Sequence, residues 1–310
     1  MNSRAWIALI AVYIVWGSTY LAIRFTIETI PPFLSAGIRF LVSGAILYGL
    51  NRLRGDPAPR KIEWRSAAII GLLLLLGGNG GLVWAEQHIP SGIASLFIAT
   101  TPLWMVLIDS LRPNGVRANW MTWLGVIVGL TGIALLANPW QSHTGSPALD
   151  PVGIVVLILA ALSWSIGSLY SRKASLPSSS LLGTGMEMLV GSLGLFVFSA
   201  VIGEWNQFDL ATLSIRSIGG LIYLIVFGSF IGFVAYTWLL RNAPTPIVST
   251  YAYVNPVVAL LLGSVIAGET LDRQDIISAL IILSGVVLIT TAKSFGIGKT
   301  YTIPLTPGED

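Results

Sequence analysis

Cysteine is absent from this sequence, and histidine and charged residues are scarce. The lack of cysteine excludes disulfides, thiolate metal sites and cysteine nucleophiles. Both histidines, His88 and His143, fall in polar connecting stretches, so a haem protein or a histidine-based intramembrane enzyme has no ligands to use. Only 10% of the 310 residues are charged, whereas a soluble domain carries roughly 25%. We therefore expect no metal, no cofactor and no soluble fold.

Positively and negatively charged residues are nearly balanced in number. There are 17 Lys and Arg against 14 Asp and Glu, and the net charge of +3 is too diffuse for nucleic-acid binding. No apolar run holds a pair of Asp residues or a Ser with a His, as intramembrane proteolysis would need. The composition therefore argues against an enzyme, and no residue is expected to be catalytic.

Long apolar runs with short polar breaks make up most of the chain. The mean hydropathy is +0.80, and 54% of the residues are apolar. A helix needs about 20 apolar residues to cross roughly 30 Å of hydrocarbon. We therefore expect an all-α integral membrane protein with ten transmembrane helices. The expected spans are residues 5–25, 33–50, 66–86, 91–111, 119–138, 152–172, 181–202, 217–240, 247–267 and 274–293.

Lys and Arg in the short loops predict the orientation, because they collect on the cytoplasmic side. With the N-terminus in the cytoplasm, the outer loops hold only Arg216 and Arg273, while Arg24 and Arg39 lie within or at the mouth of helices. The other thirteen fall inside, which predicts that both termini are cytoplasmic. These are Arg4, Arg52, Arg54, Arg60, Lys61, Arg65, Arg112, Arg117, Arg172, Lys173, Arg241, Lys293 and Lys299.

The chain contains an internal repeat. An offset of 148 residues aligns Trp16 with Trp164 and Arg39 with Glu187, and an offset of 154 then aligns Trp84 with Trp238. We expect two five-helix repeats, residues 1–140 and 150–295, followed by a cytoplasmic tail, 296–310. Because five is odd, the second repeat enters the membrane inverted, which is the architecture of many secondary transporters. The alternative is an old duplication kept only for packing.

Aromatic and polar residues recur inside the expected spans. Trp16 and Trp164 fall near the bilayer midplane, whereas tryptophans that anchor a helix lie at its ends. Each begins a helix face of four-residue steps, through Tyr20 to Arg24 and through Ser168 to Arg172. We interpret these faces as cavity linings rather than ordinary packing. The full set of expected substrate-binding residues is Trp16, Tyr20, Arg39, Asn79, Trp84, Ser95, Thr101, Trp164, Ser168, Trp238, Tyr251, Tyr253 and Asn255.

Proline and glycine mark other features of the spans. Pro102 and Pro256 are expected to kink two helices at equivalent positions, freeing carbonyls beside polar side chains at a midplane site. A purely structural kink is the alternative. The GGNGG segment at 77–81 allows close helix approach. Its Asn79 either forms hydrogen bonds between helices or contacts a ligand. The small-xxx-small pair of Gly125 and Gly129 is a candidate face for a homodimer.

Charged residues inside spans are functional candidates, because they are expensive to place in hydrocarbon. Arg39 and Glu187 each lie roughly 9 Å deep, from opposite sides, at 1.5 Å per residue. Arg39 is therefore a candidate partner for a carboxylate, and Glu187 for the coupling proton. The alternative is snorkelling combined with static ion pairs. The set expected to couple protons or to gate is Glu187, Glu86, Arg24 and Arg172.

With these residues in place, the chain resembles the EamA family of the drug/metabolite transporter superfamily, and in particular its YedA-type branch. The resemblance covers residues 5–293 and rests on WGSTY at 16–20, AGIRF at 36–40, GNG around Asn79, PSGIAS at 90–95, MEML at 186–189, YAYVNPVVALLLG at 251–263 and GET at 268–270. It implies two inverted repeats, a cavity built from helices 1–4 and 6–9, and export of small metabolites or toxic compounds.

We therefore expect a transporter of the inner (plasma) membrane that exports a small amphipathic metabolite or drug by alternating access, coupled to protons. Its expected partners are the small-molecule substrate, the lipid bilayer and the proton. A midplane lining of Trp, Tyr, Ser and Asn suits a ligand with an apolar body and a few polar groups. The alternatives are a passive channel or facilitator and, further off, an intramembrane enzyme.

Overall fold

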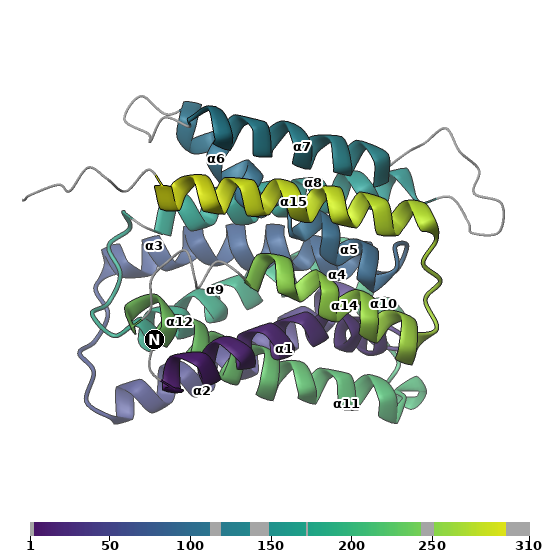
Figure 1. Ribbon diagram of the computed structural model, residues 1–310. Helices are drawn as coiled ribbons and strands as arrows, with labels where there is room; N and C mark the ends of the chain where they lie inside the picture. Colours follow the sequence, from purple (N-terminus) through teal and green to yellow (C-terminus); the bar gives the residue numbers. More distant parts are fainter. Residues whose placement is uncertain (1–2, 112–118, 137–148, 172, 243–250, 296–310) are drawn as a thin grey trace, which may run out of the picture.

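The structure of the chain, a computed structural model, describes residues 3–111, 119–136, 149–171, 173–242 and 251–295. Every regular element in these ranges is a helix, and they contain no strand (Figure 1). In the first half of the chain the elements are α1 (Ser3–Thr26), α2 (Pro32–Leu53), α3 (Lys61–Gly71), η1 (Leu72–Gly80), α4 (Gly81–Ala85), α5 (Ser91–Ile98), α6 (Thr101–Leu111) and α7 (Trp120–Leu136).

The second half follows the same order of long helices. Its elements are α8 (Pro151–Ser171), α9 (Ser180–Val201), α10 (Glu204–Gln207), η2 (Leu210–Thr212), α11 (Ile215–Tyr223), η3 (Leu224–Ile231), α12 (Gly232–Asn242), α14 (Tyr251–Ala267) and α15 (Arg273–Phe295). Helical backbone fills most of every expected span wherever the structure describes it.

Seven helices among the described residues are long and apolar enough to cross a bilayer. Two shorter apolar helices, Trp120–Leu136 and Val254–Ala267, accompany them. The all-helical class expected for an integral membrane protein therefore agrees with the structure. The candidate spans are Ser3–Thr26, Pro32–Leu53, Lys61–Ala85, Ser91–Ile108, Pro151–Ser171, Ser180–Val201 and Ile215–Tyr236.

Local sequence sets where these helices begin. Pro32 occupies the first turn of α2, where a missing N–H costs nothing. The hydroxyl of Ser214 accepts from the N–H of Ser217 at the start of α11, and Asn119 and Asp150 cap α7 and α8 in the same way. Such side-chain caps satisfy backbone groups that the helix itself leaves free.

The helices pack in pairs that join the two halves of the chain. α2 lies along α9, α1 lies against α11, α12 and α14, and α8 lies against η1, α4 and α6. α7 and α15 run side by side at the top of Figure 1. The buried core formed between the halves includes Phe40, Phe97 and Leu103.

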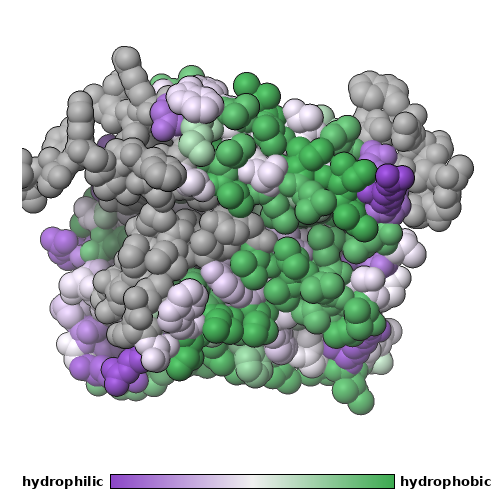
Figure 2. Space-filling view, viewed as in Figure 1, coloured by the Kyte–Doolittle hydropathy of each residue, from purple (hydrophilic) through white to green (hydrophobic). Residues whose placement is uncertain are grey.

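The outer surface is apolar across the middle of the helices. Figure 2 shows a broad hydrophobic face with hydrophilic residues gathered towards its two ends. Large apolar side chains such as Ile7, Leu193 and Val197 point outward with more than half of their surface exposed. Such an apolar surface is suited to hydrocarbon rather than to water.

The expected homodimer face at Gly125 and Gly129 is used within the chain instead. A Cβ atom built on Gly125 would lie 2.8 Å from the carbonyl oxygen of Gly285, and one built on Gly285 would lie 2.6 Å from the amide nitrogen of Gly129. The two glycines therefore bring α7 and α15 into backbone contact. Because α15 covers it, this glycine face is not available to a second copy of the chain.

Candidate functional site

Two helices change to π-helical winding in their middle, which the sequence analysis did not foresee. η1 carries LLLLLGGNG and η3 carries LIVFGSFI. The offset of 154 residues that aligns Trp84 with Trp238 aligns most of η1 with η3. Long π-helical stretches are rare. Where they occur they often mark functional sites, because the wider winding moves side chains and carbonyls off the regular helix face. The pair therefore marks a candidate functional region in each half.

Trp16 of α1 packs against the π-helical segment of the second half. Its indole Nε1 donates to the carbonyl oxygen of Gly228 at 3.2 Å. A Cβ atom on Gly232 would fall on the indole ring, so only glycine leaves room there. The rings of Phe233, Tyr236 and Tyr251 surround the indole with centroids 5.5, 4.9 and 5.2 Å away. Trp16 therefore sits in a filled aromatic cluster.

Trp164 of α8 makes the equivalent crossing with η1 of the first half. A Cβ atom on Gly78 would lie 2.9 Å from Cε3 of Trp164. The hydroxyl of the neighbouring Ser163 donates to the carbonyl oxygen of Leu73 at 2.7 Å. Trp164 matches Trp16 at the 148-residue offset, and Gly78 matches Gly232 at the 154-residue offset. Each half thus places its tryptophan on the glycine of the other half.

Two further pairs of contacts are reciprocal in the same way. A Cβ atom on Gly37 would lie 2.8 Å from the ring of Phe196, and one on the equivalent Gly185 would lie 2.8 Å from the amide nitrogen of Tyr48, which matches Phe196. In the other pair, Thr19 contacts Gly228, and Gly167 contacts Leu74. Gly167 matches Thr19 at the 148-residue offset, and Leu74 matches Gly228 at the 154-residue offset. Positions of α1, α2 and η1 therefore make contacts that recur at the matched positions of the other half.

The helix that contains Pro102 is interrupted. α5 ends at Ile98, and α6 begins at Thr101. The hydroxyls of Thr100 and Thr101 donate to the carbonyl oxygens of Phe97 and Ile98 at 2.5 and 2.7 Å. The carbonyl that Pro102 frees is thus satisfied within its own helix. Thr101 consequently has its hydroxyl occupied, and Ser95, which donates to Gly92 at 2.5 Å, is in the same situation.

Pro256 behaves differently from Pro102. It lies inside α14, which is continuous from Tyr251 to Ala267. The amide nitrogen of Asn255, in its hydrogen-bonding orientation, donates to the carbonyl oxygens of Tyr13 and Tyr251 at 3.3 and 3.2 Å. Asn255 thus ties α14 to α1 rather than facing a ligand.

Arg39 is buried with most of its donors unused. Its side chain is 4% exposed, and its Nε donates to the hydroxyl of Ser229 at 3.1 Å. A Cβ atom on Gly228 would lie 3.0 Å from Nη2, so η3 closes over the guanidinium. Arg39 forms no ion pair with any residue that the structure describes, whereas the exposed Arg216 pairs with Glu28 at 3.2 Å.

Glu86, Arg24 and Tyr20 lie at one end of the helix bundle. Glu86 is fully buried, and neither of its carboxylate oxygens has a hydrogen-bond partner. Nη1 of Arg24 donates to the backbone oxygen of Glu86 at 2.9 Å and so caps the end of α4. The hydroxyl of the buried Tyr20 makes no hydrogen bond within the described ranges.

Glu187 lies in the middle third of α9, where the helix meets α3. A Cβ atom on Gly71 would fall on the backbone oxygen of Glu187, so the two helices are in backbone contact. Its carboxylate makes no hydrogen bond or ion pair with the described part of the chain. Arg172, which belongs to the same expected coupling set, is outside the described residues.

Two carboxylates that the sequence analysis did not consider as site residues hold helix N-termini across the halves. Glu204 accepts from the N–H groups of Phe33 and Leu34 at 3.1 and 2.9 Å. Glu269 accepts from the N–H groups of Ser91 and Gly92 at 2.8 and 3.0 Å. The sequence does contain a pattern that points to these two residues, because each Glu directly follows a glycine at the end of a long apolar segment. In the structure both glycines, Gly203 and Gly268, have positive φ.

The remaining candidates are scattered over the bundle. The rings of Trp84 and His88 contact each other at a tilt, with centroids 4.9 Å apart. Asn79 lies in η1 with a buried side-chain oxygen that has no partner. Ser168 and Trp238 are partly buried, in α8 and α12, and the side chain of Tyr253 lies outside the described residues. No group of three potential metal ligands occurs in the described ranges.

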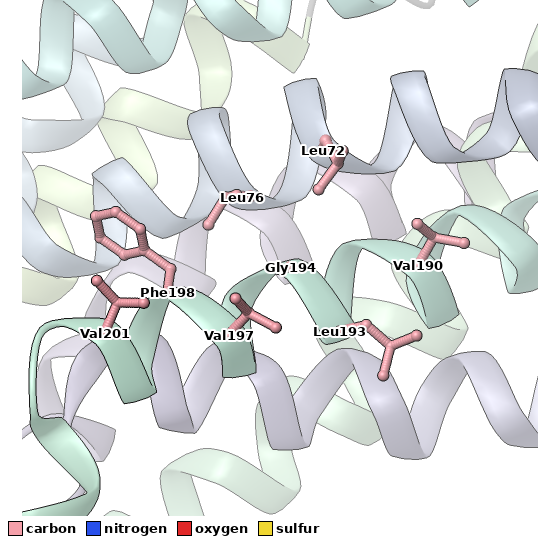
Figure 3. A pocket seen from close by; sticks show the side chains of 8 residues that line it. All are labelled: Leu72, Leu76, Val190, Leu193, Gly194, Val197, Phe198 and Val201. Atoms are coloured by element: carbon pink, nitrogen blue, oxygen red, sulfur yellow. The ribbon is translucent and has the colours of Figure 1, made fainter.

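An apolar groove of about 380 Å³ runs between η1 and α9 (Figure 3). Leu72 and Leu76 project from one side, and side chains from Val190 to Val201 line the other. Val201 and Leu193 are 77% and 59% exposed, so the groove opens to the outer surface. It contains none of the expected site residues, and its lining is suited to lipid chains.

Comparison with known proteins assigns the family. The sequence model of the EamA-like transporter family matches residues 3–138 and 151–291. The chain is therefore a member of the EamA-like transporter family, a family of transporters rather than of enzymes.

Individual relatives agree over nearly the whole length. The protein named "Uncharacterized inner membrane transporter YedA" of Escherichia coli is 37% identical over 96% of this chain and 94% of its own length. The "Uncharacterized transporter YoaV" of Bacillus subtilis is 25% identical over 93% of this chain and 97% of its own. A protein crystal structure with 20% identity has a TM-score of 0.63 and covers 95% of this chain and 99% of that one, which is a likeness of fold.

Proposed function

We propose that this protein is a secondary active transporter that exports small amphipathic metabolites or drugs across the inner membrane, coupled to protons. It works by alternating access, with ten transmembrane helices in two inverted repeats, residues 1–140 and 150–295. Both termini and the tail, 296–310, lie in the cytoplasm. The family membership supports transport, and the inner-membrane relative YedA supports the location.

The reciprocal tryptophan–glycine crossings carry this proposal. Trp16 on Gly232 and Trp164 on Gly78 are equivalent contacts exchanged between the halves. Two inverted repeats related by an in-plane two-fold axis produce such exchanged contacts, and rocking one half against the other then exposes a central site to each side in turn. The two separate matches to the family model, one in each half, support the same division.

The side chains with unused polar groups are the best candidates to act in transport. Arg39, Tyr20 and Asn79 have free donors or acceptors among the described residues and are proposed to contact substrate. Glu187 and Glu86 have carboxylates without partners and are proposed to bind the coupling proton. A buried polar group without a partner costs free energy, so its retention favours a function.

Counterflow in proteoliposomes tests the proposed function. Vesicles preloaded with an unlabelled compound are diluted into the same compound in labelled form, using amino acids, nucleosides and cationic drugs in turn. A carrier accumulates label transiently and saturates. A channel shows neither effect, and an enzyme returns a chemically altered compound. Absence of counterflow with every compound would contradict the proposal.

A further inference from the structure

Arg39 is neither snorkelling to the membrane surface nor held in a static ion pair. It lies seven residues after Pro32, so its Cα is roughly 10 Å along α2. At 4% exposure its guanidinium is closed off from lipid headgroups. Its hydrogen bond is to Ser229 in η3 of the other half, and no carboxylate of the described residues pairs with it. A buried charge without a counter-ion is unfavourable.

The contact with Ser229 leaves Nη1 and Nη2 of the guanidinium without a hydrogen bond in the described ranges, while Cζ lies 4.8 Å from the centre of the Phe40 ring. Arginine has five N–H donors in a planar fork and stays charged at neutral pH. Ser229 takes the Nε donor, while Nη1 and Nη2 make no hydrogen bond within the described ranges. Because Nε is held, the fork has a fixed direction. Such a fork matches the two oxygens of a carboxylate.

The neighbouring polar groups do not compete for these donors. The hydroxyl of Thr19, whose methyl group lies against Gly228, donates to the backbone oxygen of Trp16 at 2.6 Å. The backbone oxygen of Gly228 already accepts from the indole of Trp16. A cation without an ion pair in the described ranges therefore lies beside the edge of an aromatic cluster.

We infer that the transported molecule is an amphipathic organic anion whose carboxylate binds the guanidinium of Arg39. This inference rests on the proposed transport function and narrows its substrate class. The carboxylate supplies the counter-charge that the protein lacks, and the apolar body of the substrate packs towards the aromatic cluster around Trp16. A carboxylate is preferred to a neutral amide of the same shape, because only the charged group offsets the buried cation.

The test uses matched sets of compounds. Phenyl, indolyl and branched aliphatic skeletons are each presented as the carboxylate, the primary amide and the primary amine. Counterflow in proteoliposomes and the rise in unfolding temperature of the purified protein are measured for each. We expect the carboxylate to be preferred by roughly tenfold or more, as for charge-assisted bidentate hydrogen bonds.

Three variants separate recognition from a structural role. Arg39→Gln should remove the preference for the carboxylate while the ligand-free unfolding temperature stays the same or rises, because a buried unpaired charge is lost. Arg39→Lys should keep part of the preference, since it retains a charge without the fork. Arg216→Gln, a matched loss of an exposed arginine that pairs with Glu28 at 3.2 Å, should leave the preference unchanged.

The outcomes distinguish the inference from the proposed function. Exchange of amides or amines in preference to carboxylates, or an unaltered preference in Arg39→Gln, would overturn the inference and leave transport standing. A lower ligand-free unfolding temperature in Arg39→Gln with the carboxylate preference intact would reduce Arg39 to a structural role. Absence of exchange with every compound would overturn both.

Discussion

The crossing of α1 with η3 and the crossing of α8 with η1 share a backbone design but differ in their side chains. In each, a tryptophan rests on a glycine of a π-helical segment. Around Trp16 three aromatic rings fill the space, and the indole N–H is hydrogen-bonded. In η1, next to Gly78, stands Asn79, whose side-chain oxygen is unsatisfied. The two crossings therefore share a backbone contact and differ in the side chains around it.

The charged residues diverge further. Arg39 and Glu187 occupy equivalent positions in α2 and α9 but carry opposite charges. Arg39 is fixed by Ser229, whereas Glu187 has no polar partner in the described ranges. A fixed guanidinium is suited to binding, and a free carboxyl group is suited to taking up and releasing a proton. The matched positions in the two halves therefore have different proposed roles.

The largest expected effect comes from Glu187→Gln. A neutral amide resembles the protonated acid and cannot release a proton, so uphill transport driven by a pH gradient should be abolished while substrate exchange continues. Accumulation and exchange are measured in the same proteoliposomes. A Glu187→Gln protein that still concentrates substrate with the wild-type pH profile would remove Glu187 from the coupling mechanism.

The second prediction concerns the glycines of the two crossings. Gly232→Ala should destabilise the protein by about 2–3 kcal/mol, because the aromatic rings prevent Trp16 from moving away from the new methyl group. Gly78→Ala should lower the free energy of unfolding by about 1 kcal/mol, because its methyl group would lie 2.9 Å from Trp164 and the indole needs to move less to make room. Thermal unfolding in detergent measures both.

Gly49→Ala is the matched control for these glycines. It lies in α2, and no atom outside its own helix lies within 4 Å of a Cβ placed on it. The substitution should therefore be neutral or stabilising, because alanine favours a helix over glycine by about 1 kcal/mol. Equal losses at Gly232, Gly78 and Gly49 would remove the distinction between the two crossings.

Much of this arrangement is readable from the sequence, because the hydrocarbon imposes a strong constraint on helix length and composition. The positions of the apolar helices and the equivalence of Trp16 with Trp164 are visible as patterns. The π-helical winding of η1 and η3 is not, because it depends on how the two halves fit together. The caps by Glu204 and Glu269 also depend on contacts between distant residues.

The same limit explains why several expected site residues have other partners. Ser95 and Thr101 satisfy carbonyls of their own helix, and Asn255 bonds to α1. Sequence shows that a span is polar, but not whether its polar groups are used within the protein. Arg39 and Glu187 remain candidates because no residue in the described ranges forms an ion pair with either, and Arg39 has only its Nε hydrogen-bonded there.

A third and smaller difference is expected between the prolines. Pro102→Ala restores an N–H that competes with the hydroxyl of Thr101 for the oxygen of Ile98, so α5 and α6 should join and transport should slow several-fold. Pro256→Ala should slow transport less, because α14 is already continuous. Initial rates of counterflow are compared at equal protein density. Unchanged rates in both variants would make these kinks purely structural.

The most direct test of the inverted-repeat account uses the absence of native cysteine. Ala58 and Asn206 are exposed and match at the 148-residue offset, so Ala58→Cys and Asn206→Cys place one thiol each at equivalent sites. In cells with a permeabilised outer membrane, a membrane-impermeant maleimide should label Asn206→Cys and should label Ala58→Cys only after the inner membrane is opened. Labelling of both thiols from the same side would contradict the account.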